Sequence, residues 1–211
     1  MKKLTTTAIA TLAVLIAVGV AFALWADVLK IHIEVETGDV DVEFRGYSVT
    51  EYVGFPDGNG GWNFVEEGSN LEAKDVGQCT VTLTDIEDEE TNGPLAGQSN
   101  AGDNDLDLKI TITNGYPGYK CEVEFEVVNT GSIPVKLYFF DEDGDRLTLP
   151  ATFTFDTDEV TCTLSGNDGA QIHPDESAWY TLSCVVEQGA DENSTYSTQI
   201  YIQARQWNEP P

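Results

Sequence analysis

The chain has 211 residues, of which 37 are acidic and 10 basic, so its net charge at pH 7 is −27. Such a surface repels nucleic acid and anionic lipid, which excludes nucleic acid as a partner and argues against binding to an anionic membrane. Hydrophobic residues make up 41% of the chain and aromatic residues 10%. These fractions exceed those of a disordered protein, and the length fits one domain of ordinary size.

The first 26 residues have the composition of an export signal. Two lysines stand near the start, and no charged residue occurs from Leu4 to Ala26. Small residues at Ala21 and Ala23 predict a signal peptide over residues 1–23, with a cut after Ala26 as the alternative. An uncleaved anchor is the competing interpretation, because an uncharged stretch of this length could span a bilayer. We expect cleavage, an extracellular protein and no stable membrane association afterwards.

After the leader, apolar and polar residues alternate with a period of two, which predicts about ten short strands. The expected strands are Val28–Glu36, Val40–Phe44, Gln78–Ile86, a strand marked by Leu106, Leu108, Ile110 and Ile112, Tyr119–Asn129, Val135–Phe140, Ala151–Phe155, Val160–Leu164, Ala178–Glu187 and Tyr196–Trp207. Two segments, Gly54–Gly68 and Glu87–Asp105, are expected to be long loops. Many short strands separated by turn residues are typical of an all-β fold, here a jelly-roll-like antiparallel β-sandwich.

Four cysteines, Cys79, Cys121, Cys162 and Cys184, each share a strand face with apolar residues and are expected to point into the core. An even number of cysteines in an exported chain predicts disulfides. The sequence allows three pairings, of which we favour Cys79–Cys121 with Cys162–Cys184. Four buried free thiols are the alternative, and the spacing does not suggest a zinc site.

Asp141, Asp143 and Asp145 alternate around Gly144, and such oxygen ligands would suit calcium. The spacing does not fit an EF-hand, and the alternative is a hairpin turn built on Asp143 and Gly144. No other cofactor is expected. Asn193, in an Asn-Ser-Thr sequon, is a candidate glycosylation site.

No motif in the sequence predicts catalysis. The two histidines, His32 and His173, lack the spacing of a zinc-binding HExxH helix, and no serine lies in a nucleophile-elbow sequence. We therefore expect a structural or binding protein and not an enzyme.

The first expected strand, Val28–Glu36, directly follows the predicted leader. It places Leu29, Ile31, Ile33 and Val35 on one face. An apolar, extended N-terminus can complete the sheet of a neighbouring subunit, as in donor-strand complementation. A head-to-tail contact of this kind does not close, so it generates a fibre. The alternative is an ordinary first strand in the sheet of its own subunit.

Several segments resemble the TasA/camelysin family of exported fibre proteins and, within it, the archaeal bundling pilins. One is the leader running into Ala23–Asp27 and a strand. The most specific is the run Tyr116–Val135, which contains the PGY and NTGSIPV sequences. The others are His173–Glu176 and the closing Gln206–Asn208. Together they extend over nearly the whole chain after the leader.

The resemblance implies a jelly-roll subunit that polymerises by N-terminal donor-strand exchange into pili or biofilm matrix fibres. The implied organisation is a signal peptide over residues 1–23, a donor strand over 24–36 and a β-sandwich over 37–211. The donor residues would be Leu24, Trp25, Val28, Leu29, Ile31, Ile33 and Val35. The expected partner is a second copy of the chain in a cell-surface filament, with lateral bundling between filaments as a further expectation.

Two other functions compete with the filament subunit. The first is a monomeric secreted or cell-surface adhesin or envelope protein. The second, less favoured, is a surface metallopeptidase, because camelysin-type members have been classed in this way. The chain contains no metal-ligand motif that would carry this activity.

Overall fold

The computed structural model describes residues 11–16, 38–68, 77–86, 105–155, 158–191 and 194–208. The chain divides into two units, residues 1–37 and residues 38–211. In the first unit, residues 11–16 form a short helical segment with exposed side chains. No helix within the described residues is long and apolar enough to cross a membrane. The predicted cleavage site and the predicted donor strand lie outside the described residues.

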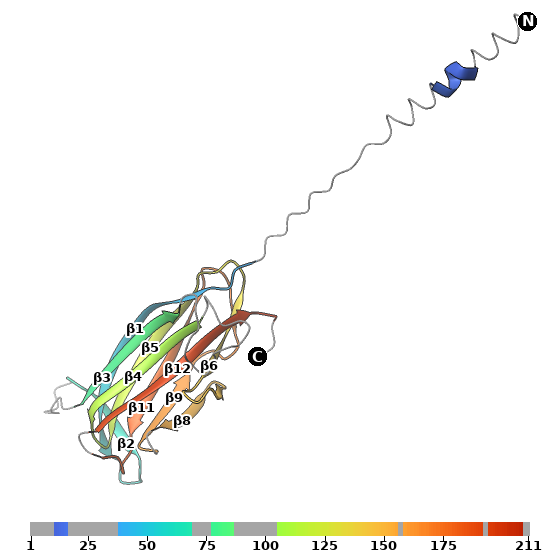
Figure 1. Cartoon of the computed structure of the whole chain (residues 1–211). Helices are drawn as coiled ribbons and strands as arrows, with labels where there is room; N and C mark the ends of the chain where they lie inside the picture. Colours follow the sequence, from blue (N-terminus) through green and yellow to red (C-terminus); the bar gives the residue numbers. More distant parts are fainter. Residues whose placement is uncertain are drawn as a thin grey trace, which may run out of the picture. The chain divides into compact units, whose positions relative to one another are not determined.

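The second unit is an antiparallel β-sandwich of two sheets (Figure 1). Sheet A consists, in spatial order, of β2 (Trp62–Glu66), β1 (Val42–Pro56), β5 (Tyr119–Asn129), β11 (Ser177–Val186), β9 (Val160–Ser165) and β8 (Ala151–Phe155). Sheet B consists of β10 (Gln171–Ile172), β6 (Val135–Phe140), β12 (Ser194–Gln206), β4 (Asp105–Gly115) and β3 (Gln78–Ile86), and β7 (Arg146–Leu147) pairs with β6. The predicted all-β sandwich is confirmed.

The core lies between the inner faces of the two sheets, and the period-two alternation determines which residues reach it. On β5, Val123, Phe125 and Val127 are fully buried, whereas Glu124 and Glu126 lie between them on the outer face. Because successive side chains of a strand point to opposite faces, this alternation buries one face and leaves the other for polar groups.

Three aromatic rings join the sheets at the centre of the core. Phe125 of β5 stacks on Tyr180 of β11 with ring centroids 5.6 Å apart, and Tyr180 meets Phe139 of sheet B at 4.8 Å. Burial raises the pKa of Tyr180 to about 12. Rings in such arrangements contribute roughly 0.5–1.5 kcal/mol per pair beyond the area that they bury.

Both disulfides have the pairing favoured from the sequence. Cys162 and Cys184 are directly paired residues of β9 and β11, with their Cα atoms 4.0 Å apart. Cys79–Cys121 joins β3 of sheet B to β5 of sheet A and therefore connects the two sheets. On the chain-entropy estimate, loops of these lengths contribute roughly 3–4 kcal/mol each. Two disulfides are typical of a protein that folds in an oxidising, extracellular environment.

The segment Gly54–Gly68, predicted to be a loop, instead contains the end of β1 and the whole of β2, so this prediction was wrong. The side chain of Asp57 closes the hairpin between them. Its Oδ1 accepts the N–H groups of Asn59 at 2.7 Å and Gly61 at 2.9 Å, and these bonds lower the pKa of the carboxyl group. A glycine-rich and asparagine-rich sequence therefore forms a tight turn between two paired strands.

Candidate functional site

The first residues of the sandwich are held by the loop between β5 and β6. The carbonyl oxygens of Asp39 and Asp41 accept N–H groups from this loop at 3.0 to 3.4 Å. The hydroxyl oxygen of Ser132 accepts the N–H of Asp39 at 2.8 Å. These bonds fix the position at which the chain enters β1. We call the contact between residues 39–41 and residues 129–133 the N-terminal clamp.

The fully buried Asn129 holds the clamp loop in place. Its Nδ2 donates to the carbonyl oxygens of Ile133 at 2.8 Å and Ile172 at 2.9 Å, and its Oδ1 accepts the N–H of Gly131 at 3.0 Å. Its backbone N–H and C=O are bonded to the turn at His173–Glu176. A buried amide that is bonded at both ends stabilises a single loop conformation, because any rearrangement would leave buried polar groups unpaired.

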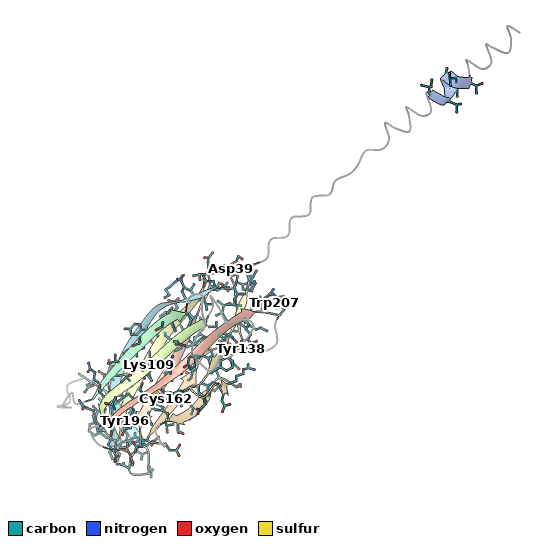
Figure 2. The ribbon with its side chains drawn as sticks, viewed as in Figure 1. Asp39, Lys109, Tyr138, Cys162, Tyr196 and Trp207 are labelled. Atoms are coloured by element: carbon teal, nitrogen blue, oxygen red, sulfur yellow. A yellow bond between two sulfur atoms is a disulfide. The ribbon has the colours of Figure 1, made fainter. Side chains whose placement is uncertain are left out.

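Three motifs that were singled out in the sequence therefore meet at the clamp. The NTGSI residues form its loop, and the His173–Glu176 turn is bonded to Asn129. The backbone N–H of the closing Trp207 donates to the carbonyl oxygen of Pro134 at 3.1 Å. Figure 2 shows Asp39 and Trp207 at the same end of the sandwich. Motifs far apart in the sequence thus meet at the end of the sandwich where its first described residues lie.

A second feature is the inner face of β1, which is only partly covered. Tyr47 is paired with Phe125 and therefore faces the interior, yet it is 53% exposed whereas Phe125 is 0% exposed. Phe44 and Val49, on the same face of β1, are half-buried. Apolar side chains on the inner face of a sandwich are normally covered by the opposite sheet. The described residues therefore cover this part of β1 only incompletely, most clearly at Tyr47.

The reason is that sheet B ends at β3. Within the described residues β3 pairs only with β4. Near Cys79 it lies close to β1 and is bonded to it through Glu51, and the Cys79–Cys121 disulfide joins it to β5. Sheet A continues beyond β5 with β1 and β2, and its cover by β3 is incomplete at Tyr47, which is 53% exposed. Val81 and Leu83 of β3 face inward and are half-buried at this side. We call the following residues the β1/β3 edge: Phe44, Tyr47, Val49, Val81 and Leu83.

The outer face of β3 lacks the usual protection of an edge strand. Its residues are uncharged, namely Gln78, Thr80, Thr82 and Thr84. Natural proteins usually place charges, proline or a bulge on an edge strand to prevent pairing with another chain. In a chain with a net charge of −27, a stretch from Gln78 to Thr84 without any charge indicates that pairing at this edge is tolerated.

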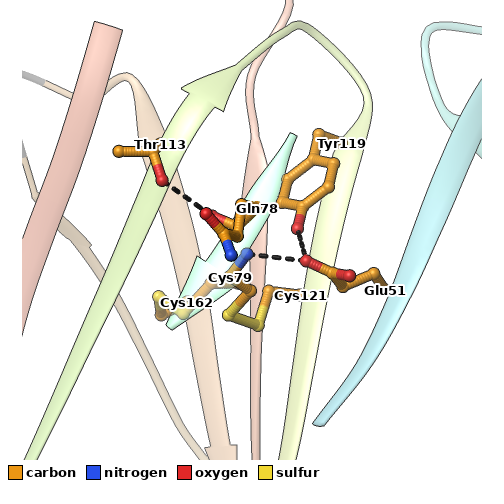
Figure 3. Close-up of a disulfide and its surroundings, with 8 residues drawn as sticks. Glu51, Gln78, Cys79, Thr113, Tyr119, Cys121 and Cys162 are labelled. Atoms are coloured by element: carbon orange, nitrogen blue, oxygen red, sulfur yellow. Dashed lines mark hydrogen bonds between the residues drawn. A yellow bond between two sulfur atoms is a disulfide. The ribbon is translucent and has the colours of Figure 1, made fainter. Parts of the chain in front are cut away.

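Glu51 of β1 lies beside Cys79 of β3 and Tyr119 of β5 (Figure 3). Its Oε1 accepts the N–H of Cys79 at 2.6 Å and also accepts the hydroxyl proton of Tyr119. Burial raises the pKa of Tyr119 well above its ordinary value, and the hydrogen bond to Glu51 adds to this shift. The carboxylate therefore accepts the backbone N–H of Cys79, which points to the side of β3 that faces away from β4.

The predicted calcium ligands form a hairpin turn between β6 and β7. Oδ1 of Asp141 accepts the N–H groups of Asp143 at 3.1 Å and Asp145 at 2.8 Å, and Gly144 has a positive φ of 85°. Within the described part of the chain, no group of three or more His, Cys, Asp or Glu side chains is placed to hold a metal ion. Calcium at this turn stays a prediction.

The remaining predicted site residues, namely the donor residues from Leu24 to Val35 and the sequon residue Asn193, lie outside the described residues. Sequence reasoning placed none of Asp39, Tyr47, Glu51 and Asn129 in a functional site. Asn129 could have been found from the NTGSIPV motif, but the contacts of the others depend on residues distant in the sequence. Comparisons with protein-family models, curated proteins and solved structures found no match.

We predict that Gly131→Ala weakens the clamp. A Cβ at this position would lie 2.5 Å from the carbonyl oxygen of Asp39 and 2.7 Å from the backbone nitrogen of Asp41. Separation of the two segments should lower the free energy of unfolding by roughly 2 kcal/mol. Gly189→Ala is the matched control, because a Cβ there meets nothing within 4 Å. Urea unfolding of both variants tests the prediction, and equal stabilities would contradict it.

We further predict that Tyr119→Phe lowers the free energy of unfolding at neutral pH by roughly 1.5 kcal/mol, because it removes a hydrogen bond to a carboxylate. The pKa of Tyr119 is raised in the folded state above its ordinary value of 10.0. Its stabilising effect is therefore complete below pH 10 and is lost as the pH rises further, when the unfolded chain ionises.

The difference between the wild-type protein and Tyr119→Phe should consequently shrink above pH 10. Urea unfolding of both proteins at neutral pH and above pH 10 measures this difference. A difference that stays constant with pH would show that Tyr119 titrates in the folded protein as it does in the unfolded chain.

Proposed function

We propose that the chain is the subunit of an extracellular filament in which the N-terminal segment of one copy completes the sandwich of the next. The observation that carries the proposal is the inward-facing Tyr47, which is left 53% exposed beside the last strand of sheet B. An incomplete sandwich of this kind needs one further extended, apolar segment to cover the inner face of β1.

The N-terminal segment has the properties that this position requires. The stretch Val28–Glu36 has nine residues, as β3 does, and alternates apolar and polar side chains. Full burial of its four inward residues, Leu29, Ile31, Ile33 and Val35, would contribute roughly 6 kcal/mol or more before the cost of association. Backbone hydrogen bonds to an edge strand would add affinity and direction.

The charge of the chain explains why a directional contact is required. With a net charge of −27, copies repel one another, and salt screens this repulsion beyond about 10 Å at 0.1 M. A buried strand with paired backbone groups can overcome this repulsion, whereas a diffuse polar contact cannot. Because the donor and the acceptor are different surfaces of one chain, the contact repeats without closing and produces a fibre.

The resemblance to the TasA/camelysin fibre proteins supports the same function. Its NTGSIPV and His173–Glu176 motifs form or support the clamp from which the donor segment leaves. The clamp holds the base of the segment on one subunit, so that the free part can reach a neighbour.

We predict that residues 24–211 assemble into fibres in moderate salt, and that Ile31→Asp abolishes assembly. The substitution places a carboxylate on the apolar face of the donor segment, where burial without a partner is costly. His32→Asp is the matched control, since it introduces the same group on the polar face. Negative-stain electron microscopy, with calcium both present and absent, distinguishes fibres from particles.

Fibres from the unsubstituted chain and from His32→Asp, with particles from Ile31→Asp and from residues 37–211, are the expected result. Folded monomers of the unsubstituted chain under all of these conditions would contradict the proposal. They would favour a monomeric surface β-sandwich.

A further inference from the structure

We propose that the N-terminal segment of a second copy binds as an additional strand of sheet B, beside β3 and over the inner face of β1, and that Glu51 ends the paired stretch at Cys79. This inference rests on the proposed function and assigns the acceptor surface to particular residues. It concerns the β1/β3 edge alone.

The backbone of β3 presents hydrogen-bonding groups on its open side. The N–H of Cys79 donates to Glu51 of β1 and therefore points away from β4. In an antiparallel pair, every second residue directs its N–H and C=O groups to the same side. Val81 and Leu83 consequently direct theirs to the open side as well, where a further strand could pair with them.

The directions of the strands indicate where such a strand would lie. β3 is antiparallel to β4, β4 ends where β5 begins, and β1 is antiparallel to β5, so β3 runs opposite to β1. Starting from the contact between Cys79 and Glu51, Val81 and Leu83 therefore lie alongside the part of β1 that contains Val49 and Tyr47. A strand beside β3 would place every second side chain over these two residues.

Of the other strands that end a sheet, namely β2, β8 and β10, β8 is a weaker candidate than β3. β8 ends sheet A on the opposite side and has five residues, whereas β3 has nine. Its inward side chains, Ala151, Phe153 and Phe155, are all half-buried, and none is exposed to the extent of Tyr47. A nine-residue segment such as Val28–Glu36 matches β3 in length and not β8.

A second copy is the proposed occupant of the edge. The clamp fixes the residues that precede β1, through the carbonyl oxygens of Asp39 and Asp41. A contact between different surfaces of two copies repeats without closing and produces the fibre that the proposed function requires.

Glu51 determines where pairing ends. Its carboxylate already accepts the N–H of Cys79 and the hydroxyl proton of Tyr119. An added strand that reached Cys79 would have to displace this carboxylate from two donors at once. Pairing therefore begins at Val81 and continues toward the end of β3, which fixes the register of the incoming strand.

A cross-linking experiment on fibres of residues 24–211 tests the assignment. A photoreactive benzoylphenylalanine replaces Thr82 on β3 in one variant and Thr152 on β8 in the other; both threonines are exposed and lie on outer strands. Isotopically labelled and unlabelled chains are mixed before assembly, and the products are identified by mass spectrometry. The expected product joins position 82 to residues 27–36 of a different copy, and no such product forms from position 152.

Cross-links from position 152 to the segment, or links from position 82 within the same copy only, would overturn the assignment. Cross-links from position 152 to the segment of a different copy would leave the proposed function standing, because the segment would then still join neighbouring subunits of the fibre. If the unsubstituted chain formed no fibres, the proposed function would fail instead, so the two failures are distinguishable.

Substitutions in the edge give an independent readout. Leu83→Asp places a carboxylate on the inward face of β3, and Phe153→Asp does the same on β8; both residues are half-buried. Loss of fibres is expected for Leu83→Asp and not for Phe153→Asp, with disulfides and circular dichroism confirming that each variant is folded. Fibre formation by folded Leu83→Asp would overturn the proposal. If either variant fails to fold, the cross-linking result decides.

Discussion

On one side of the sandwich, sheet B covers the inner face of β1 only incompletely. The proposed assembly depends on this feature. Near Cys79, β3 is joined to β5 by the disulfide and to β1 by the hydrogen bond of Glu51. Farther along β1 the cover by the described residues is incomplete, and Tyr47, on its inner face, is 53% exposed. Because apolar surface that faces a core is costly to leave in water, this side is suited to an added strand.

One strand, β1, connects the features that the proposed assembly needs. The clamp at Asp39 and Asp41 holds the residues before it, Tyr47 belongs to its uncovered face, and Glu51 marks the end of that face. In the proposed assembly, β1 thus follows the donor segment in the chain and contributes to the acceptor edge. The buried amide of Asn129 stabilises the loop of the clamp.

The strands could be predicted well from the sequence, whereas the candidate site could not. The strands β3, β5, β6 and β8 begin and end at the predicted residues. Burial of one face of a strand makes apolar and polar residues alternate in its sequence, as around Val123, Phe125 and Val127 of β5. β2 was missed because its hairpin depends on the hydrogen bonds of Asp57 in a glycine-rich segment. The clamp joins residues 93 positions apart, and the exposure of Tyr47 depends on where sheet B ends. Neither leaves a local signal.

Helical reconstruction of fibres by electron cryomicroscopy would test the central claim most directly. The account predicts density for an additional strand in sheet B, beside β3, that covers Tyr47 and Val49 and connects to the clamp of the neighbouring subunit. A fibre in which the β1/β3 edge stays open to solvent, or is covered by a segment of the same copy, would contradict it.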